Sequence, residues 1–576
     1  MVQRYRVAII EPATFPKQFA GEKGHKSVYT GVLMPRAIPA LAAVLQEHGF
    51  EVRGWSGELS DINVTEIADW ADCVCLSVMS NGATHGLMLA YQFGELWKPV
   101  IMGGYHFAQN ELNEHTLQQT EEALTFGCSF VIRGEGYTSL PALLQLLARQ
   151  RQTGHAIASS DLREINGLSW RTSNGRFQHN IAHLLDVQLT DLPLADWSAL
   201  QDPDKTLRTL GVHGMSGCPR GCPWCGVRTR DGNGTNRNSD IRMVAEIEAA
   251  LAVLPRIGHI FFSSDNIVVF RDWFLELCAE LKRRDMKIPW SCQAEIPTLV
   301  KHPELLDAAA ASGCVRFCLG LESINNQTLH DTDKHQTREE MEQVISDIHG
   351  AGIAVHGMFI VGLPGDTEAD IERTLTWALA QRIETVQFLC LSDLPGSLEY
   401  EQLHLWESDQ SYRPFTGLYA PLNWVFLNGH YVRRHSQELS LQQVQRLSVR
   451  VMQQYYRFDR LLGRLFKPRF EVWQGRRRQG KSRWQATKAM LLHQLVAFGL
   501  GLRGYTNIGS WLNPHNDLNQ GYLASVEART PAAREVAIEK MLRAFPPEWL
   551  TICELVATAE QAHRVTKSAV AIAAER

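Results

Sequence analysis

Short apolar segments alternate with helical patterns along the first 150 residues, and this alternation limits the folds open to the chain. Residues 36–48 show the helical pattern most clearly, because apolar side chains recur every three or four positions and Gly49 follows as a stop. Strands that alternate with helices form parallel, doubly wound sheets. Residues 1–150 are therefore predicted to form a Rossmann-like binding domain with strands within 5–12, 50–55, 73–80, 99–104 and 129–136.

A second α/β stretch is predicted over residues 205–400. It contains six apolar segments separated by helical patterns, which is typical of six β/α units. Such units predict a parallel barrel of the TIM type, here a partial (β/α)6 barrel. The six expected strands lie within 209–213, 258–263, 288–293, 315–320, 354–361 and 385–391.

The remaining segments differ from both α/β stretches. Residues 151–204 are predicted to be a β-hairpin, with its turn at Asn174-Gly175, followed by a linker rich in proline and aspartate. Residues 401–576 are predicted to form a mainly helical C-terminal domain. The segment 440–458 fits an amphipathic helix in which Tyr455 and Tyr456 are expected to pack against the rest of the protein.

Length and composition limit the class of protein. A chain of 576 residues predicts two or three domains, and 45% hydrophobic with 21% charged residues is typical of a globular protein. The formal net charge of −5 argues against nucleic acid as a partner. The start of the chain does not resemble a signal peptide and no run of eighteen apolar residues occurs, so a cytoplasmic protein is expected.

Twelve cysteines in a chain expected to lie in a reducing compartment do not predict a disulfide framework. Most stand alone in apolar segments and are expected to be small buried side chains; examples are Cys73, Cys75, Cys314, Cys318 and Cys390.

Three other cysteines lie close together in the segment GMSGCPRGCPWCGVRTR. Cys218, Cys222 and Cys225 have the spacing C-x3-C-x2-C, and three thiolates on one loop can bind an iron–sulfur cluster. Because such a cluster normally takes four cysteine ligands, one iron would stay open to another ligand. The alternative is a structural zinc site, which needs a fourth ligand nearby, and His213 is the only close candidate.

The triplet, with Trp224 just before its last cysteine and an expected barrel strand before it, resembles the radical S-adenosylmethionine (SAM) superfamily. The resemblance implies a [4Fe–4S] cluster on Cys218, Cys222 and Cys225. It further implies that SAM chelates the open iron and is cleaved reductively to a 5′-deoxyadenosyl radical. By the same resemblance Trp224 would lie near the adenine of SAM, although a packing role beside the cluster is equally compatible.

Three further segments resemble the same family, and their order along residues 205–400 matches it. Ser263, Ser264 and Asp265 follow the second expected strand, where relatives contact the methionine amine, although the family's commoner residues differ. Asp265 is the preferred candidate there, with a loop cap as the alternative. GLESINNQTL places Glu322 where relatives contact ribose, the alternative being a salt bridge at the barrel rim. HGMFIVGLPGDT resembles the strand that supports adenine, through Gly357, Gly362 and Gly365.

The first 150 residues resemble the cobalamin-binding domain that precedes many radical SAM barrels. The segments SVMSN, MGGYHFAQN and IRGEGYTSLPALL correspond to loops that surround the corrin in relatives. Glycines there let backbone amides approach a planar ligand, and ordinary loop chemistry is the alternative for each residue. The motif D-x-H-x-x-G, whose histidine binds cobalt in the methionine synthase type, is absent. The implied cobalamin-binding residues are Ser77, Ser80, Gly103, Gly104, His106, Gly134, Glu135 and Gly136.

A basic segment, 476–488, precedes an apolar one, 489–502, in the C-terminal region. The favoured interpretation is a solvated helical face followed by a core helix. A basic, amphipathic segment can also lie on an anionic membrane surface, which makes peripheral membrane contact the alternative.

The order of the two α/β domains predicts a cobalamin-dependent radical SAM methyltransferase that methylates an unactivated carbon of a small-molecule or lipid-like substrate. An electron donor such as flavodoxin or ferredoxin would be its protein partner. One alternative is a radical SAM enzyme that does not methylate, such as a porphyrin cyclase or a ring-rearranging enzyme. A second alternative is a sensor that binds the cofactors without turnover.

Overall fold

The computed structural model describes residues 4–16, 35–107, 114–183, 187–201, 208–398, 400 and 411–574, and of these the side chains up to residue 560 apart from 114–116, 229, 233 and 235. Its first layer is a seven-stranded sheet with the order β2-β1-β3-β4-β5-β6-β7. Five strands are parallel, as predicted: β1 (Arg6–Glu11), β2 (Glu51–Ser56), β3 (Cys73–Ser77), β4 (Val100–Gly103) and β5 (Phe130–Ile132).

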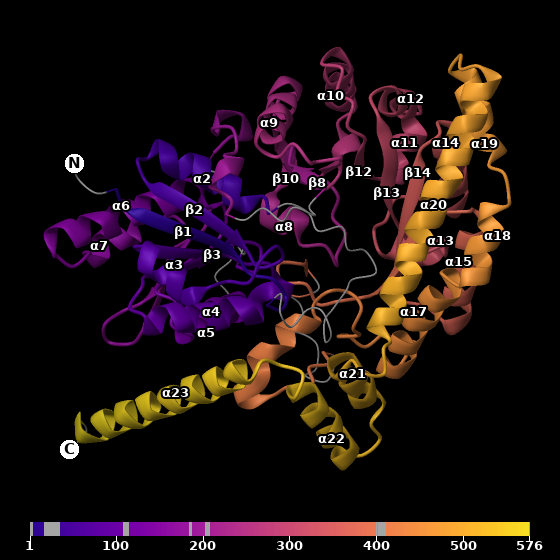
Figure 1. Cartoon of the computed structure of the whole chain (residues 1–576). Coiled ribbons are helices and arrows are strands. Elements are labelled where there is room, and N and C mark those ends of the chain that lie inside the picture. Colours follow the sequence, from indigo (N-terminus) through magenta and orange to yellow (C-terminus); the bar gives the residue numbers. More distant parts are fainter. Residues whose placement is uncertain are drawn as a thin grey trace.

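Apolar strands at the centre of this sheet are covered on both faces by helices (Figure 1). Val7 lies opposite Val52 on one side and Cys73 on the other, and all three side chains are buried. Parallel sheets need such two-sided cover, which explains their near-continuous hydrophobic strands. The helices of this domain are α2 (Ala37–Glu47), α3 (Val64–Trp70), α4 (Ala83–Glu95), α5 (Glu114–Thr125), α6 (Gly136–Thr153) and the short α7 (Ser159–Arg163).

The hairpin predicted between the domains belongs to the first sheet. Its strands β6 (Leu168–Arg171) and β7 (Phe177–His179) extend the sheet in antiparallel register, with Trp170 opposite Phe130. Trp170 is buried, so its apolar contact with β5 explains why the hairpin pairs with this sheet. A boundary at residue 150 therefore divides one sheet.

The second sheet contains six parallel strands in the order β15-β14-β13-β12-β11-β8. Each overlaps one of the six predicted segments, and β8 and β15 are the two edges, as in a partial barrel. The strands are β8 (Thr209–Val212), β11 (His259–Phe262), β12 (Trp290–Ala294), β13 (Cys314–Glu322), β14 (Ala354–Val361) and β15 (Thr385–Cys390).

Helices follow the barrel strands in regular alternation. Two of them begin with a capping box, in which a threonine side chain accepts a hydrogen bond from the amide of the third helical residue, and the carboxylate of that residue accepts one from the threonine amide. These boxes, at Thr337 and Thr367, explain where the helices start. The barrel helices are α9 (Asp240–Val253), α10 (Arg271–Arg283), α11 (Ile296–Lys301), α12 (Glu304–Ala311), α13 (Asn326–Asp331), α14 (Arg338–Gly350) and α15 (Glu368–Ala380).

Beyond β15 the described residues form helices, apart from an isolated bridge between Ser411 and Arg434. Tyr455 and Tyr456 are buried, which confirms their predicted packing role. The elements are η6 (Gly417–Phe426), α17 (Leu441–Tyr455), α18 (Phe458–Leu465), α19 (Phe470–Arg478), α20 (Arg483–Trp511), α21 (Asp517–Glu527), α22 (Pro531–Leu542) and α23 (Pro547–Ala574).

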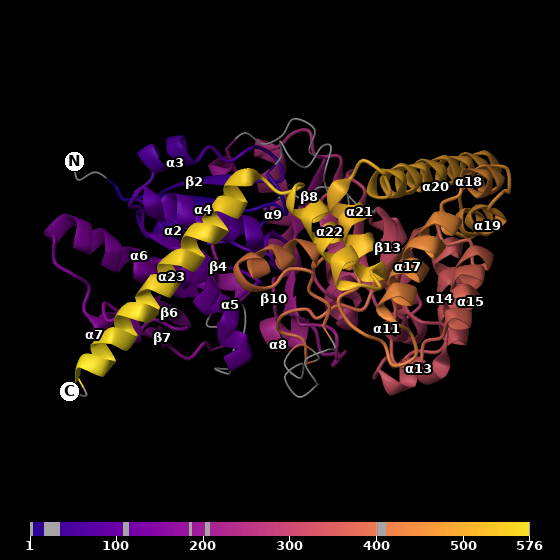
Figure 2. The ribbon, with the colours of Figure 1, turned by 90° about the horizontal axis from the view of Figure 1, so that it is seen from below.

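These C-terminal helices contact both α/β units. Helix α17 packs on β15, while η6 and α23 contact α4 of the first domain. Figure 2 shows α23 running along the first domain, and Figure 1 shows α20 on the opposite side of the barrel from that domain. Thr84 donates a hydrogen bond to the Pro421 carbonyl (2.7 Å), and Trp424 donates one to Glu122 (2.8 Å). The C-terminal region thus joins the two sheets.

Candidate functional site at the barrel mouth

The three cysteines of the triplet lie on one loop of a small hairpin that follows β8. Its strands, β9 (Met215–Gly217) and β10 (Asn233–Arg237), are antiparallel, and the short helix α8 (Val227–Asp231) lies between them. The Cys218 amide donates to the Gly232 carbonyl (3.0 Å), and the Cys225 amide donates to the Cys222 carbonyl (3.1 Å). These bonds fold the loop into a turn that places the three thiols on one short segment.

All three thiols are free and partly exposed, whereas the other nine cysteines are free and buried. This contrast confirms the predicted separation of the triplet from the lone cysteines. Burial raises the pKa of Cys218 and Cys222, and it raises the pKa of Cys225 to about 11. The loop can therefore offer three sulfur ligands to a cluster whose positive charge would favour the thiolates.

Glycine is required at the base of this hairpin. Gly217 has φ +89°, and a Cβ there would lie 2.3 Å from the Gly232 carbonyl oxygen. Because β9 and β10 approach so closely at this point, a side chain would separate them.

A charged tether holds the cysteine loop against the barrel. Arg220, between the first two cysteines, donates two hydrogen bonds to the carboxylate of Glu295, at 2.7 and 2.6 Å. Glu295 follows β12 and also accepts a hydrogen bond from Thr298. Burial alone raises the pKa of Glu295, but the Arg220 guanidinium outweighs burial and lowers it. On the neighbouring loop Asn266 donates to the Cys218 sulfur (4.0 Å).

Glu322, the predicted ribose contact, ends β13 in a left-handed conformation with φ +59°. Its carboxylate lies 3.0 Å from the Lys334 ammonium, and both side chains are largely buried. Burial alone lowers the pKa of Lys334, but the charges of Glu322 and Cys222 raise it above its usual value. A Cβ on Gly320 would lie 2.6 Å from Glu322, so glycine there makes room for the pair. Glu322, the carboxylate proposed to contact ribose, therefore also forms the salt bridge at the barrel rim that was its alternative role.

The three polar residues after β11 have different roles. Ser264 is fully buried and accepts the Gly214 amide (2.9 Å), so it closes a loop. Ser263 donates to the Val212 carbonyl (3.2 Å). Burial and the charge of Asp231 raise the pKa of Asp265 to about 6, and Asp265 interacts electrostatically with Cys225. Ser263 and Ser264 thus hold the loop together through hydrogen bonds to backbone groups, whereas the Asp265 carboxylate lies beside the cysteine loop.

The glycines of the segment HGMFIVGLPGDT lie in or after β14. A Cβ on Gly357 would meet Leu321 (3.0 Å) and Phe359 (3.2 Å), so this glycine is packed within the barrel wall. Gly362 has φ +95°, and its amide donates to Asp366 (3.1 Å). The second carboxylate oxygen of Asp366 is buried without a hydrogen-bond partner. This glycine turn therefore presents a buried acceptor that sequence reasoning missed.

The residues predicted to contact cobalamin lie after β3, β4 and β5. Gly104 has φ +96°, and a Cβ there would lie 2.6 Å from the Val78 backbone nitrogen. Glycine therefore lets the loop after β4 pass close to the loop after β3. His106 is buried: one ring nitrogen bonds Ser80 (3.3 Å), the other has no partner, and the ring packs on Trp424. The remaining members lie at the same edge: Ser77 at the end of β3, Gly103 at the end of β4, Gly134 and Glu135 between β5 and α6, and Gly136 at the start of α6.

A charged cluster that the sequence analysis missed joins this edge to the barrel. The Arg230 guanidinium lies 3.7 Å from the centre of the Tyr105 ring and 2.7 Å from Asp231. Burial and the charge of Asp231 raise the pKa of Glu135 to about 7, while Arg36 and Arg230 oppose this shift. Arg230 and Asp231 lie shortly after the cysteine triplet in the sequence, and this closeness could have marked them as candidate site residues. The cluster places the edge of the first sheet against the cysteine hairpin.

His213, the candidate zinc ligand, is buried and bonds Ser216 through Nε2 (3.1 Å), while its Nδ1 has no partner. Burial lowers its pKa well below the usual value. Across the described ranges no three histidine, cysteine or acidic side chains are grouped to hold a single metal ion. The loop carries three free thiols, and an iron–sulfur cluster held by three thiolates keeps one open iron.

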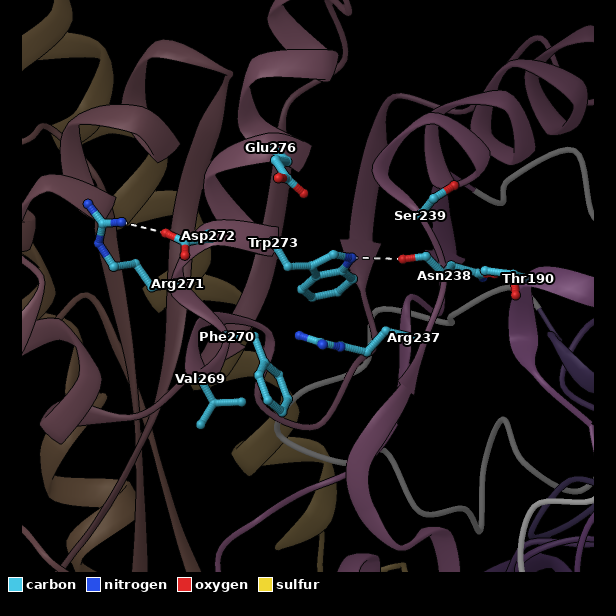
Figure 3. A pocket seen from close by; sticks show the side chains of 10 residues that line it. All are labelled: Thr190, Arg237, Asn238, Ser239, Val269, Phe270, Arg271, Asp272, Trp273 and Glu276. Carbon is cyan, nitrogen blue, oxygen red and sulfur yellow. Dashed lines mark hydrogen bonds and ion pairs between the residues drawn. The ribbon is translucent and has the colours of Figure 1, made fainter.

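Figure 3 shows a hollow of about 650 Å³ beside the barrel. It lies between β10 with the start of α9 and the start of α10, where Arg237 stacks on Phe270 at 3.9 Å and Trp273 donates to the Asn238 carbonyl (2.7 Å). Its lining includes none of the predicted site residues.

Residues 212–378 match the Radical SAM superfamily. A bacteriochlorophyllide d C-12(1)-methyltransferase of Chlorobaculum tepidum is 29% identical over 223 residues, which cover 37% of this chain and 48% of that protein. An anaerobic magnesium-protoporphyrin IX monomethyl ester cyclase of Rubrivivax gelatinosus is 24% identical, covering 47% of this chain and 48% of that protein. The chain spans about half the length of these two relatives.

Two solved structures share the fold over most of the chain. The radical SAM methyltransferase TsrM from Kitasatospora setae, with cobalamin and a [4Fe–4S] cluster bound, has a TM-score of 0.56 at 16% identity, covering 76% of this chain and 85% of that one. The cobalamin-dependent SAM radical enzyme OxsB, with aqua-cobalamin bound, has a TM-score of 0.57 at 13% identity, covering 96% and 84%. These likenesses confirm the predicted α/β architecture.

Proposed function

We propose that this chain is a cobalamin-dependent radical SAM methyltransferase, because residues 212–378 match the Radical SAM superfamily. The proposal depends most on one observation: the loop with three free thiols lies between the barrel mouth and the edge of a second, doubly wound sheet. Two cofactors with different chemistry can meet at such a junction, and the protein then has to hold and orient them.

Cys218, Cys222 and Cys225 would hold a [4Fe–4S] cluster, with SAM at its open iron. When bound, these cofactors and cobalamin supply radical formation and a transferable methyl group. Glu322 would accept hydrogen bonds from sugar hydroxyls; its ion pair with Lys334 at 3.0 Å supports this role, because it holds the carboxylate at the end of β13. Asp265, beside the third cysteine, would meet the amine of SAM. Trp224 stays a proposed adenine contact, and Gly362 a proposed support for the ring.

Cobalamin would bind at the edge formed by the loops after β3, β4 and β5. The buried Nε2 of His106, which has no partner, fits a polar group of a ligand at this edge. The residues proposed to line it are Ser77, Ser80, Gly103, Gly104, His106, Gly134, Glu135 and Gly136. The substrate, a small molecule or a lipid-like one, would enter between this edge, the barrel and the C-terminal helices. A flavodoxin or ferredoxin would supply electrons, and the chain would contact a membrane peripherally.

A non-methylating cyclase is the second candidate, favoured by the likeness to the magnesium-protoporphyrin cyclase. The two activities differ in product mass, because methylation adds a CH2 unit whereas ring formation changes the hydrogen or oxygen count.

The test begins with anaerobic reconstitution with iron, sulfide and hydroxocobalamin, followed by desalting and an absorption spectrum. We expect bands of both a cluster and a corrin, reductive cleavage of SAM, and a product heavier by one CH2. Cys222→Ala should abolish the cluster band, whereas Cys278→Ala, at a buried cysteine of α10, should retain it. A cluster without corrin would contradict the methyltransferase and favour the cyclase. Cofactor binding without SAM cleavage would instead favour a sensor.

A further inference from the structure

Helix α20 has apolar side chains on two opposite faces. One face packs on the neighbouring helices through Ala486, Met490, Ile508 and Trp511, which are buried. The other face is exposed, yet it carries apolar side chains beside Lys488, where a surface helix normally places charged and polar residues. Its exposed fractions are 70% for Trp484, 53% for Leu491, 58% for Leu492, 59% for Leu495 and 50% for Val496. The prediction of a core helix over 489–502 is therefore wrong, because only one side of the segment is covered.

The exposed apolar residues recur at helical spacing. Trp484, Lys488, Leu491 and Leu495 follow one another at intervals of three or four residues, which places them on one side of the helix. Phe466 and Phe470, on the segment leading into α19, are also exposed, at 77% and 61%. Helices α18 and α19 both pack on α20. The name apolar face is used below for Trp484, Leu491, Leu492, Leu495 and Val496.

A strong positive charge surrounds the apolar face. Residues 457–511 contain twelve lysines and arginines against two acidic residues, although the whole chain has a net charge of −5. No acidic residue occurs between 472 and 511. Exposed cations precede or accompany the face along the chain, and the Lys488 ammonium lies 5.4 Å from the centre of the Trp484 ring. These cations are Arg477, Arg478, Lys481, Arg483 and Lys488.

We propose that the apolar face and its flanking cations form a docking surface for an anionic lipid bilayer. Leucine, valine and tryptophan side chains suit the boundary between headgroups and acyl chains, and the cations suit anionic headgroups. Among the described residues no helix is long and apolar enough to cross a membrane. Helix α20 would accordingly lie on the bilayer. This inference is independent of the methyl-transfer proposal.

The position of α20 is compatible with docking of the folded protein. His493 and Arg469 bind the buried carboxylate of Glu384 at 2.9 and 2.6 Å, so the packed side of the helical region is fixed to the barrel. Figure 1 shows α20 at the side of the barrel away from the first sheet, so a bilayer there would leave the cysteine loop and the first domain uncovered.

Flotation of the reconstituted full chain with vesicles tests the proposal. We expect it to bind vesicles of phosphatidylglycerol and phosphatidylcholine, to bind phosphatidylcholine alone at least about tenfold more weakly, and to dissociate from the anionic vesicles as salt is raised. Equal binding to both vesicle types, or binding to neither, would overturn it.

Two pairs of variants locate the surface. Leu491→Ser with Leu495→Ser should weaken binding at least about tenfold, because two apolar side chains no longer enter the lipid. The matched control changes two other exposed apolar residues, Val536→Ser with Leu555→Ser, and should bind as the parent does.

The charge pair is Lys481→Glu with Arg483→Glu, and it should also weaken binding at least about tenfold. Its control, Lys282→Glu with Lys301→Glu, changes exposed lysines on α10 and α11 and should have little effect. If a control pair weakened vesicle binding as much as its test pair, the docking surface would not lie at the apolar face. Sedimentation velocity without lipid is the second measurement: a dimer of the parent that Leu491→Ser with Leu495→Ser dissociates would assign the apolar face to a second copy and overturn the proposal.

Discussion

At the scale of single residues, Arg220 connects the cysteine loop to the barrel. Its two hydrogen bonds to Glu295 neutralise a largely buried carboxylate next to the proposed cluster. Without the guanidinium, the Glu295 carboxylate would keep Thr298 and neighbouring dipoles as its partners. Among the described interactions, the cysteine loop would also lose its ion pair with the residue that follows β12. Arg220 is thus a positioning residue for the loop.

We expect Arg220→Met to lower both cluster content and stability. The free energy of unfolding should fall by about 1–3 kcal/mol, the usual cost of leaving a partly buried charged group without its partner. Iron and sulfide per chain after reconstitution, together with denaturant unfolding, measure the two effects. Arg256→Met, at an exposed arginine between α9 and β11, is the control. Equal cluster content in Arg220→Met and the parent would refute the positioning role.

Glu135 should make stability depend on pH. Burial and Asp231 raise its pKa to about 7, so the folded state binds a proton more tightly than the unfolded state does. Stability from this group is complete below its unfolded pKa of about 4.5 and is lost as pH rises through about 7.

Glu135→Gln should remove this loss. Thermal unfolding between pH 4.5 and 8 should show a smaller decline with pH for Glu135→Gln than for the parent, with the variant the more stable at pH 8. Glu47→Gln, at an exposed glutamate of α2, should leave the profile unchanged. A parent and a Glu135→Gln variant with parallel profiles would disprove this assignment.

At the scale of elements, the β9–β10 hairpin shows how backbone geometry positions reactive side chains. The six barrel strands follow from apolar segments that the sequence displays, whereas this hairpin is short and polar and depends on Gly217. A Cβ on Gly217 would meet backbone atoms of Asp231 and Gly232, so no side chain can be accommodated there.

We expect Gly217→Ala to cost about 2–4 kcal/mol and to reduce cluster content, because its Cβ would lie 2.3 Å from the Gly232 carbonyl oxygen and its φ is +89°. Gly258→Ala is the matched control, since a Cβ there meets nothing within 4 Å. Denaturant unfolding and iron content provide the measurements. Similar results for both variants would show that the hairpin tolerates a side chain at this position.

At the scale of the whole molecule, buried charge fixes the C-terminal helices to the barrel. Glu384, just before β15, lies 2.6 Å from Arg469 and 3.3 Å from His349, and its side chain is fully buried. Burial alone raises the pKa of Glu384, but Arg469 and His349 lower it well below its usual value. The helices α19 and α20 thus depend on a carboxylate of the barrel.

Arg469→Met should loosen this attachment. Loss of one partner of a buried ion pair costs about 3–5 kcal/mol, because Glu384 keeps its burial and loses its main cation. Limited proteolysis should then cut the segment between 466 and 483 faster than in the parent, and thermal unfolding should begin earlier. Arg477→Met, at an exposed arginine of α19, is the control. Unchanged proteolysis in Arg469→Met would contradict this role.

The sequence by itself determined the elements whose patterns are local. Apolar segments predicted the five parallel strands of the first sheet and the six strands of the second, and the spacing of Cys218, Cys222 and Cys225 predicted a loop that offers three thiols. These features depend on neighbours along the chain, so a single sequence contains them. The order of the segments likewise determined the order of the domains.

Only the tertiary structure decided the features that join distant residues. Arg220 meets Glu295 across 75 positions, His106 packs on Trp424, and the hairpin at 168–179 joins the first sheet. The exposure of Leu491 and Leu495 was equally hidden, because an apolar helix looks alike in sequence whether one face or both are covered. Burial, and with it the charge of Glu135 and Glu384, depends on which surfaces meet, and local patterns do not specify that.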